Sequence, residues 1–131
     1  MFKKATASST PQESRPAPWL MLIVDAEPEV HSITRLALSD CEYLGRKLEF
    51  INAYSAAEAM TVLRAKPDIA LAFVDVVMEH DHAGLELVDH IRNELGNRAI
   101  RLILRTGQPG MAPERQVIRD FDINDYMSKT A

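Results

Sequence analysis

Polar side chains suited to binding a cation and a phosphoryl group follow the apolar runs of this sequence: Asp25, with Glu27 close behind it, Asp75, Thr106 and Lys129. Carboxylates repel one another and bind a hard cation such as Mg²⁺ through their oxygen atoms. A metal ion and an ammonium group together offset the charge of a phosphate. Each residue alone is typical of a helix cap or a turn, so the prediction of a phosphoryl site depends on their occurring together.

Apolar runs and amphipathic segments alternate along the chain and predict the elements that position this set. The expected strands are 19–24, 48–54, 69–74, 100–105 and 123–127, and helices are expected after Pro28, Ser55, Gly84 and Pro113. This alternation predicts βα units around a parallel sheet. Because crossovers are right-handed, the C-terminal ends of the strands share one rim, and ligands bind where the strand order reverses.

Helical spacing also predicts which side chains face the core. The first helix is expected to bury apolar residues at that spacing: Val30, Ile33, Ala37 and Cys41. The second begins with S-A-A-E, a capping box, and has an apolar stripe of Ala56, Ala59, Met60 and Leu63. The third is expected to bury Leu87, Val88, Ile91 and Leu95 and to stop at Gly96. His31 and His90 are expected on helix surfaces.

Composition restricts the class of protein. The chain has 131 residues, a net charge of −4 and a pI near 5.5, which indicates one globular domain and argues against a nucleic-acid surface. Neighbouring arginines interleave with acids and are interpreted as a solvated face: Arg92, Arg98, Arg101 and Arg105. A single cysteine fits a reducing compartment. No apolar run reaches the ~20 residues of a membrane helix, so a cytoplasmic protein is expected.

The N-terminal segment differs from the rest of the chain. Residues 1–18 are rich in Ser, Thr and Pro and contain almost no core-forming residues, which predicts a flexible leader before a domain of residues 19–131.

Four stretches carry a resemblance to a known family: LIVDAEPEV, FVDVVM, ILRTG and DYMSK. Over about residues 19–131 the chain resembles the receiver domain of bacterial two-component response regulators. The resemblance implies a flavodoxin-like, doubly wound, five-stranded parallel sheet with strand order 2-1-3-4-5. It also implies that Asp75 accepts a phosphoryl group from a histidine kinase and that Asp25 holds Mg²⁺ through water. The main-chain carbonyl of Val77 would be a further metal ligand, with Glu27 as an additional candidate.

The resemblance assigns the remaining site residues and the partners. Thr106 and Lys129 would bind the phosphoryl group, and Tyr126 would move inward with Thr106. A sensor histidine kinase or a phosphotransfer protein would be the donor, and the receiver would catalyse its own slow phosphorylation and dephosphorylation. A narrower similarity, in RTGQPGMAPERQVIRDFDINDY and DVVMEHDHAGL, is to receivers that precede a sensor-like domain and a cyclic di-GMP phosphodiesterase or another signalling output, normally C-terminal.

Departures from the family pattern leave alternatives open. Ala26 stands where the family has a second acid that touches the metal, and Glu79 stands where it commonly has proline. The chain ends at Ala131, where a fifth helix is expected to begin; a truncated last helix would expose apolar surface and favour a homodimer.

The second reading is therefore a pseudo-receiver, a protein-interaction module that binds Mg²⁺ poorly. A third is a phosphatase resembling haloacid dehalogenases, whose nucleophile lies on the first strand. A transition-metal site at His80 and His82 is a weaker alternative.

Overall fold

The computed structural model describes residues 17–106 and 124–128, with the side chains of Thr106 and of residues 125–128 left out. Its strands are β1 (Trp19–Val24), β2 (Glu42–Tyr43), β3 (Arg46–Ala53), β4 (Leu71–Asp75), β5 (Arg101–Thr106) and β6 (Asp125–Ser128). Its helices are α2 (Pro28–Leu38), α3 (Ala56–Ala65) and α4 (Ala83–Asp89), which continues as the wider turns of η2 (His90–Glu94). Residues 1–16 of the predicted leader, the helix after Pro113 and Lys129 lie outside the described residues. The last two residues of the leader, Ala17 and Pro18, accept hydrogen bonds from Arg46 through their carbonyls.

The sheet has the order β2-β3-β1-β4-β5-β6. The five longer strands are parallel and confirm the predicted order 2-1-3-4-5. One additional strand, β2, was not predicted. It pairs antiparallel with the start of β3. Its two residues connect to β3 through Leu44 and Gly45, both with positive φ, of 53° and 75°, a conformation that suits a two-residue hairpin turn.

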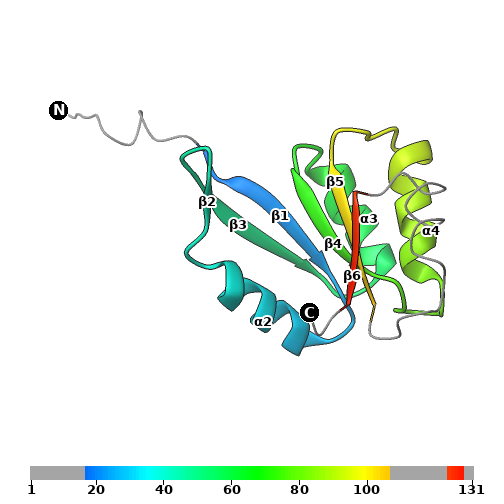
Figure 1. The fold of residues 1–131 in the computed structure, drawn as a ribbon. Coiled ribbons are helices and arrows are strands. Elements are labelled where there is room, and N and C mark those ends of the chain that lie inside the picture. Colours follow the sequence, from blue (N-terminus) through cyan, green and yellow to red (C-terminus); the bar gives the residue numbers. More distant parts are fainter. Residues whose placement is uncertain (1–16, 107–123, 129–131) are drawn as a thin grey trace.

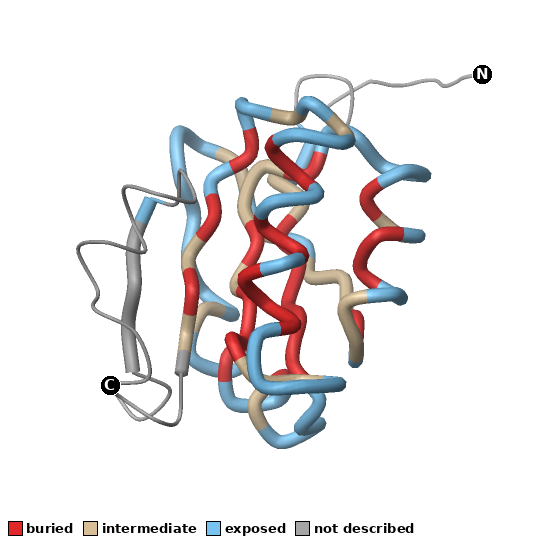
Figure 2. Tube along the Cα trace, turned by 90° about the vertical axis from the view of Figure 1, so that its right-hand side faces the viewer, coloured by how far each residue is buried: buried red, intermediate tan, exposed pale blue. Residues whose placement is uncertain are grey.

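Helices cover the two faces of the sheet unequally. Figure 1 shows α2 on one face and α3 and α4 on the other. The second face holds the core, in which residues from β1, β4 and β5 such as Leu22, Val74 and Leu104 are fully or almost fully buried against α3 and α4. Figure 2 shows the buried residues concentrated along the central strands and on the helices packed against them. None of the helices in the described part of the chain is long and apolar enough to cross a membrane.

Local signals explain where α3 and α4 begin and end. Ser55 Oγ accepts a hydrogen bond from the amide of Glu58 at 3.1 Å, as the capping box predicts. The Glu58 carboxylate binds the amide of Tyr54 at 2.6 Å, one residue before the expected partner. Gly96, with φ of 66°, ends the helical segment that starts at Ala83, because glycine adopts the left-handed conformation without steric strain. The apolar stripes predicted for α3 and α4 are buried or half-buried.

The predicted inward face of α2 is wrong. Ile33 is 66% exposed, Ala37 and Cys41 are exposed, and Val30 is half-buried. The buried residues of α2 are instead His31 and Thr34. Cys41 is therefore not a core residue, and His31 is not on the surface, whereas His90 is exposed as predicted.

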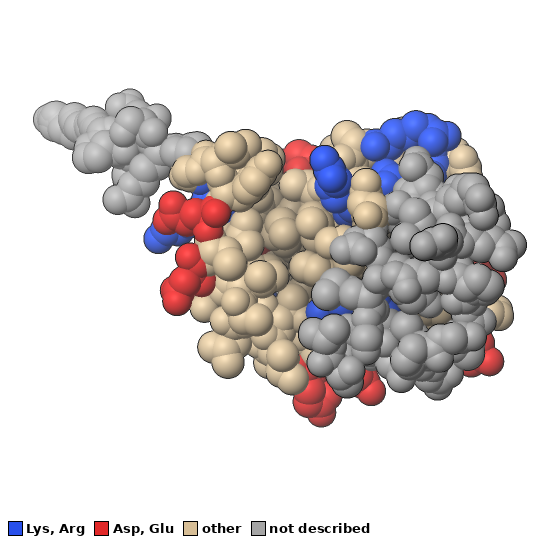
Figure 3. All heavy atoms as spheres, in the orientation of Figure 1, with Lys and Arg blue, Asp and Glu red and all other residues tan. Residues whose placement is uncertain are grey.

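The face that carries α2 presents little charge. Figure 3 shows a broad uncharged area over β1, β3 and α2, with charged side chains at its borders. The exposed large apolar residues Ile33 and Leu36 belong to α2. A hollow of about 750 Å³ on this side of the sheet is lined in part by Trp19, Leu71 and Ile103. The expected truncation of a last helix concerns residues after 128, which the structure does not describe.

Candidate phosphoryl site

Two carboxylates lie side by side at the carboxyl rim of the sheet. Val24 of β1 pairs with Val74 of β4, and the next residue on each strand is an aspartate, Asp25 and Asp75. Between β1 and β4 the strand order reverses, because the chain passes from β1 to β3 on one side and then to β4 on the other. Both carboxylates therefore lie at the topological switch point, where parallel sheets bind ligands.

Asp25 is held from several directions. Asp25 is fully buried. Its backbone amide donates a hydrogen bond to the Ala53 carbonyl at 3.1 Å, and its Oδ1 accepts one from the Glu27 amide at 2.9 Å. The imidazole of His31 donates through Nε2 to the Asp25 carbonyl at 2.8 Å, and its Nδ1 lies 2.8 Å from Oδ1 of Asn52. His31 thus connects α2 to the ends of β1 and β3, a role that the sequence did not reveal.

Asp75 is the last residue of β4 and is 5% exposed. Its Oδ1 accepts from the amide of Val77 at 3.4 Å. Gly84 packs against it so closely that an added Cβ would lie 2.0 Å from the Asp75 carbonyl oxygen. The Gly84 amide also donates to the Val76 carbonyl at 2.9 Å. Glycine is needed here because only a residue without a side chain permits this approach of α4 to the strand end.

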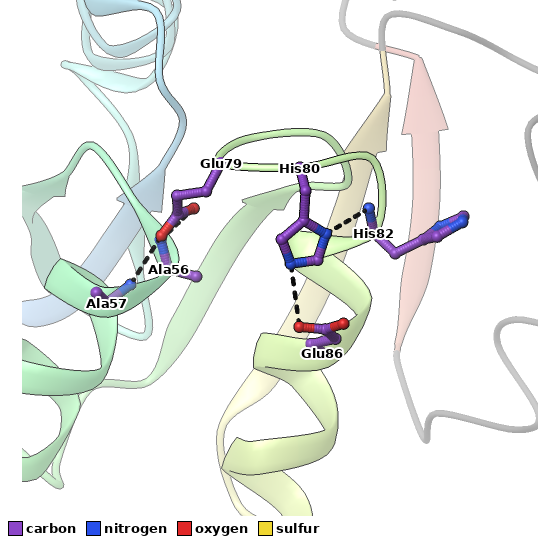
Figure 4. Close-up of polar contacts among 6 residues, drawn as sticks. All are labelled: Ala56, Ala57, Glu79, His80, His82 and Glu86. Carbon is purple, nitrogen blue, oxygen red and sulfur yellow. Dashed lines mark hydrogen bonds and ion pairs between the residues drawn. The ribbon is translucent and has the colours of Figure 1, made fainter.

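The loop from Val76 to His82 is fastened to both neighbouring helices (Figure 4). The Glu79 carboxylate accepts from the amides of Ala56 at 3.0 Å and Ala57 at 3.3 Å, at the start of α3. Although burial alone would raise the pKa of Glu79, hydrogen bonds from backbone amides and the nearby His80 lower it overall. His80 Nε2 lies 3.1 Å from the exposed Glu86 carboxylate of α4. The Glu79 and His80 contacts thus connect the loop that contains Val77 to α3 and α4.

Among the described residues, Arg105 is a cation close to this rim, and its predicted place on a solvated face is wrong. Arg105 of β5 is the register partner of Asp75 and is half-buried rather than solvated. Its Nη1 donates to Thr34 Oγ1 of α2 at 2.9 Å, and its guanidinium carbon lies 4.7 Å from the ring centroid of Phe73. Burial lowers the pKa of Arg105 below its usual value and outweighs the charges of Asp25 and Asp75, which raise it.

Arg92 is also not part of a solvated face. Its side chain is buried at 4% exposure and donates to the carbonyls of Asn97 at 3.1 Å and Ile100 at 2.8 Å, as well as to Asn124 Oδ1 at 3.2 Å. These bonds connect η2 to the strands and are remote from the acidic rim.

Only some of the other predicted site residues have described side chains. Ala26 and Glu27 are exposed and Val77 is half-buried. Thr106 ends β5, where it pairs with Ser128, and Tyr126 lies within β6, but their side chains and the whole of Lys129 are outside the description. The roles assigned to these residues stay predictions.

The donor set at the rim is chemically suited to a magnesium ion. Within residues 17–106 and 124–128 no group of three His, Cys, Asp or Glu side chains could hold a metal ion, which also leaves the His80–His82 alternative without support there. Mg²⁺, however, is commonly bound by one or two carboxylates and keeps several water molecules. Asp25 and Asp75 supply two such carboxylates at this rim, and the Val77 carbonyl as a further ligand stays a prediction.

The sequence is similar to part of a longer known protein. No protein-family model matches the chain. Over 113 residues the chain is 54% identical to the 3′3′-cGAMP-specific phosphodiesterase 2 of Vibrio cholerae serotype O1, covering 86% of this chain and 22% of that protein. The chain therefore spans about a fifth of the length of this curated relative.

Solved structures give the same fold. The signal receiver domain of an HD domain-containing protein from Pseudomonas fluorescens Pf-5 matches with a TM-score of 0.67 and 24% identity, covering 86% of this chain and 83% of that chain. The Mn²⁺-bound form of the response regulator Rcp1 matches with a TM-score of 0.69 and 15% identity, covering 85% of this chain and 81% of that chain.

Proposed function

We propose that this chain, whose fold is that of the response-regulator receiver domains, is a phosphorylation-dependent signalling switch that accepts a phosphoryl group on Asp75. The observation that carries the proposal is the position of Asp75 and Asp25, each one residue after the paired Val74 and Val24, at the switch point of the sheet. Asp75 is 5% exposed, so an incoming phosphoryl group can approach it only from the rim.

The chemistry is a phosphoryl transfer in which Asp75 is the nucleophile. One carboxylate oxygen of Asp75 attacks the phosphorus of a phosphohistidine, the new O–P bond forms as the P–N bond breaks, and the imidazole nitrogen keeps the electron pair. Asp25, Asp75 and the Val77 carbonyl would hold Mg²⁺, which offsets the negative charge on the transferred group. Lys129 would pair with a phosphoryl oxygen.

Two residues would transmit the change. Thr106 would bind the phosphoryl group from the end of β5, and Tyr126 of β6 would move inward with it. The register of β5 and β6 supports this arrangement, because the backbone at Thr106 pairs with the backbone at Ser128, two residues after Tyr126.

The partners follow from the same proposal. A sensor histidine kinase or a phosphotransfer protein would donate the phosphoryl group, and the switch would control an output domain that follows the receiver. The likeness to part of a 3′3′-cGAMP-specific phosphodiesterase supports a cyclic-dinucleotide phosphodiesterase as that output. A cytoplasmic location and a homodimer formed through the uncharged α2 face (Figure 3) complete the proposal.

A pseudo-receiver is the second candidate, and Ala26 is the observation that favours it. A methyl group at the exposed position after Asp25 cannot bind a metal ion. The chain would then keep the fold as a protein-interaction module while binding Mg²⁺ poorly and accepting no phosphoryl group.

Mass spectrometry after incubation with acetyl phosphate and Mg²⁺ separates the two. We expect the wild-type chain to gain one phosphoryl group and Asp75→Asn to gain none. Asp81→Asn, which changes an exposed aspartate in the same loop, is the matched control and should behave as wild type. An adduct of equal yield on the Asp75 variant would exclude this nucleophile, and no adduct on the wild type would favour the pseudo-receiver.

A further inference from the structure

Arg105 lies on the same side of the sheet as the two site carboxylates. Register partners in parallel strands direct their side chains to the same face, so Arg105 shares a face with Asp75, its partner on β4. Ile23 pairs with Phe73, and Asp25 and Asp75 each follow that pair by two residues, which places both on this face. The guanidinium contact with Phe73 at 4.7 Å agrees with the placement.

The guanidinium is fixed in position. Thr34 accepts its Nη1 hydrogen at 2.9 Å, which attaches it to α2, and the Phe73 ring lies beneath it. Its Nε and Nη2 are buried and have no hydrogen-bond partner within the part of the chain that the structure describes. An arginine remains protonated even when buried, so a permanent positive charge lies beneath the acidic rim, and two of its nitrogens have no partner among the described residues.

We infer that Arg105 is an internal counter-ion of the Asp25–Asp75 pair, which stabilises the metal-free site and weakens the binding of a divalent cation there. The inference rests on the proposed function only in taking this pair as the cation site. Within the described residues, Arg105 places one positive charge close to the two negative charges of Asp25 and Asp75.

Electrostatics gives the direction of the effect. A bound Mg²⁺ is repelled by the guanidinium and gains less from carboxylates that already have a positive neighbour. Ala26 also weakens Mg²⁺ binding, because its methyl group supplies no anionic ligand. The same positive charge would favour the phosphorylated form of Asp75, which carries more negative charge than the free carboxylate.

The test is a Mg²⁺ titration of the folded chain at low ionic strength, followed through the backbone NMR signals of Asp25 and Asp75. Arg105→Met and Arg105→Gln remove the charge, and Arg105→Lys keeps it. Arg101→Met, on the same face at the exposed start of β5, is the matched control. We expect the two neutral variants to bind Mg²⁺ at least about threefold more tightly than wild type, with the lysine variant and the control within about twofold.

A second readout separates a counter-ion from a residue that only packs. Thermal unfolding without metal should occur at lower temperature in both neutral variants, and Mg²⁺ should raise their Tm by more than it raises that of the control. Should Arg105→Met fail to fold, Arg105→Gln supplies both measurements. Unchanged Mg²⁺ affinity in the neutral variants, or no binding in any variant at millimolar Mg²⁺, would overturn the inference.

Phosphorylation distinguishes this failure from that of the proposed function. If Asp75 gains no phosphoryl group from acetyl phosphate while the neutral variants bind Mg²⁺ more tightly, the counter-ion stands and the switch function fails. If Asp75 is phosphorylated while Mg²⁺ affinity is the same in all variants, the function stands and Arg105 is not a counter-ion.

Discussion

Glu79 should support both the start of α3 and the loop that follows Asp75. Its carboxylate accepts hydrogen bonds from the amides of Ala56 and Ala57 at 3.0 and 3.3 Å. These amides belong to the first turn of α3 and have no acceptor within the helix. Replacing Glu79 with alanine therefore leaves two helix-start amides to water and releases the loop from α3.

The magnitude follows from known effects of helix caps. Loss of a side-chain cap lowers the free energy of unfolding by about 0.5 to 2 kcal/mol, and a negative charge near a helix start contributes about 0.3 to 1 kcal/mol at an exposed position. Because Glu79 is exposed, water and salt screen its charge. We expect Glu79→Ala to lower the free energy of unfolding by about 1 to 1.5 kcal/mol and Glu79→Gln, which keeps one acceptor, by about half of that.

The pH dependence gives a sharper signature. The pKa of Glu79 lies below its usual value of 4.5 in the folded chain, so its charge contributes stability that is fully present above about pH 4.5 and is lost as the pH falls through the folded pKa. The difference in stability between wild type and Glu79→Gln should therefore be largest near pH 7 and shrink below pH 4.5.

Urea unfolding followed by circular dichroism measures both effects, with Glu94→Gln as the control. Glu94 is an exposed acid whose neighbour is His90 at 3.1 Å, and its substitution should change stability by less than about 0.5 kcal/mol. Amide hydrogen exchange should also become faster from Val76 to Glu79 in the Glu79 variants. An effect no larger than that of the control, or one of equal size at pH 3.5 and pH 7, would refute this account.

Three further variants test other contacts. Gly84→Ala should destabilise the fold by at least about 1 to 3 kcal/mol, measured by urea unfolding, because the new Cβ would lie 2.0 Å from the Asp75 carbonyl oxygen; near-wild-type stability would show that α4 can move. His31→Phe should lower stability by about 1 to 3 kcal/mol in the same assay, because a buried carbonyl loses its donor. Replacing both Ile33 and Leu36 with serine should change stability by less than about 0.5 kcal/mol per residue and reduce concentration-dependent association in sedimentation; equal association would place the homodimer surface elsewhere.

The strands and the acidic rim could be predicted because they depend on local pattern and on one topological rule. The apolar runs before Asp25 and Asp75 form strands, of which the last four residues of β1 are buried on both faces, as in parallel sheets covered by helices, while Leu71 and Phe73 of β4 are half-buried. Given alternating strands and helices, the rule that crossovers are right-handed then brings both aspartates to one rim. No tertiary contact had to be known in advance.

The orientation of α2 could not be predicted in this way. An apolar stripe indicates the buried side of a helix only where the helix packs on apolar residues. Here α2 packs on polar residues of the sheet. His31 of α2 contacts Asn52, and Thr34 of α2 accepts a hydrogen bond from Arg105. Hydrogen bonds between polar residues therefore set the rotation of α2 and leave Ile33 exposed.

The charge of the site cannot be predicted from single positions in the sequence. Ala26 is visible as a missing acid because its neighbours in the chain identify the motif. Arg105 is visible only through register, since the side chains that surround it come from α2, β1 and β4. Ala26 leaves the rim without a negative charge and Arg105 places a positive charge beneath it, so on our inference both weaken cation binding. Whether this chain is a metal-dependent switch or an interaction module therefore depends on the combined effect of Ala26 and Arg105 on Mg²⁺ affinity. We expect Ala26→Asp alone to increase this affinity. The double variant, Ala26→Asp with Arg105→Met, should increase it further.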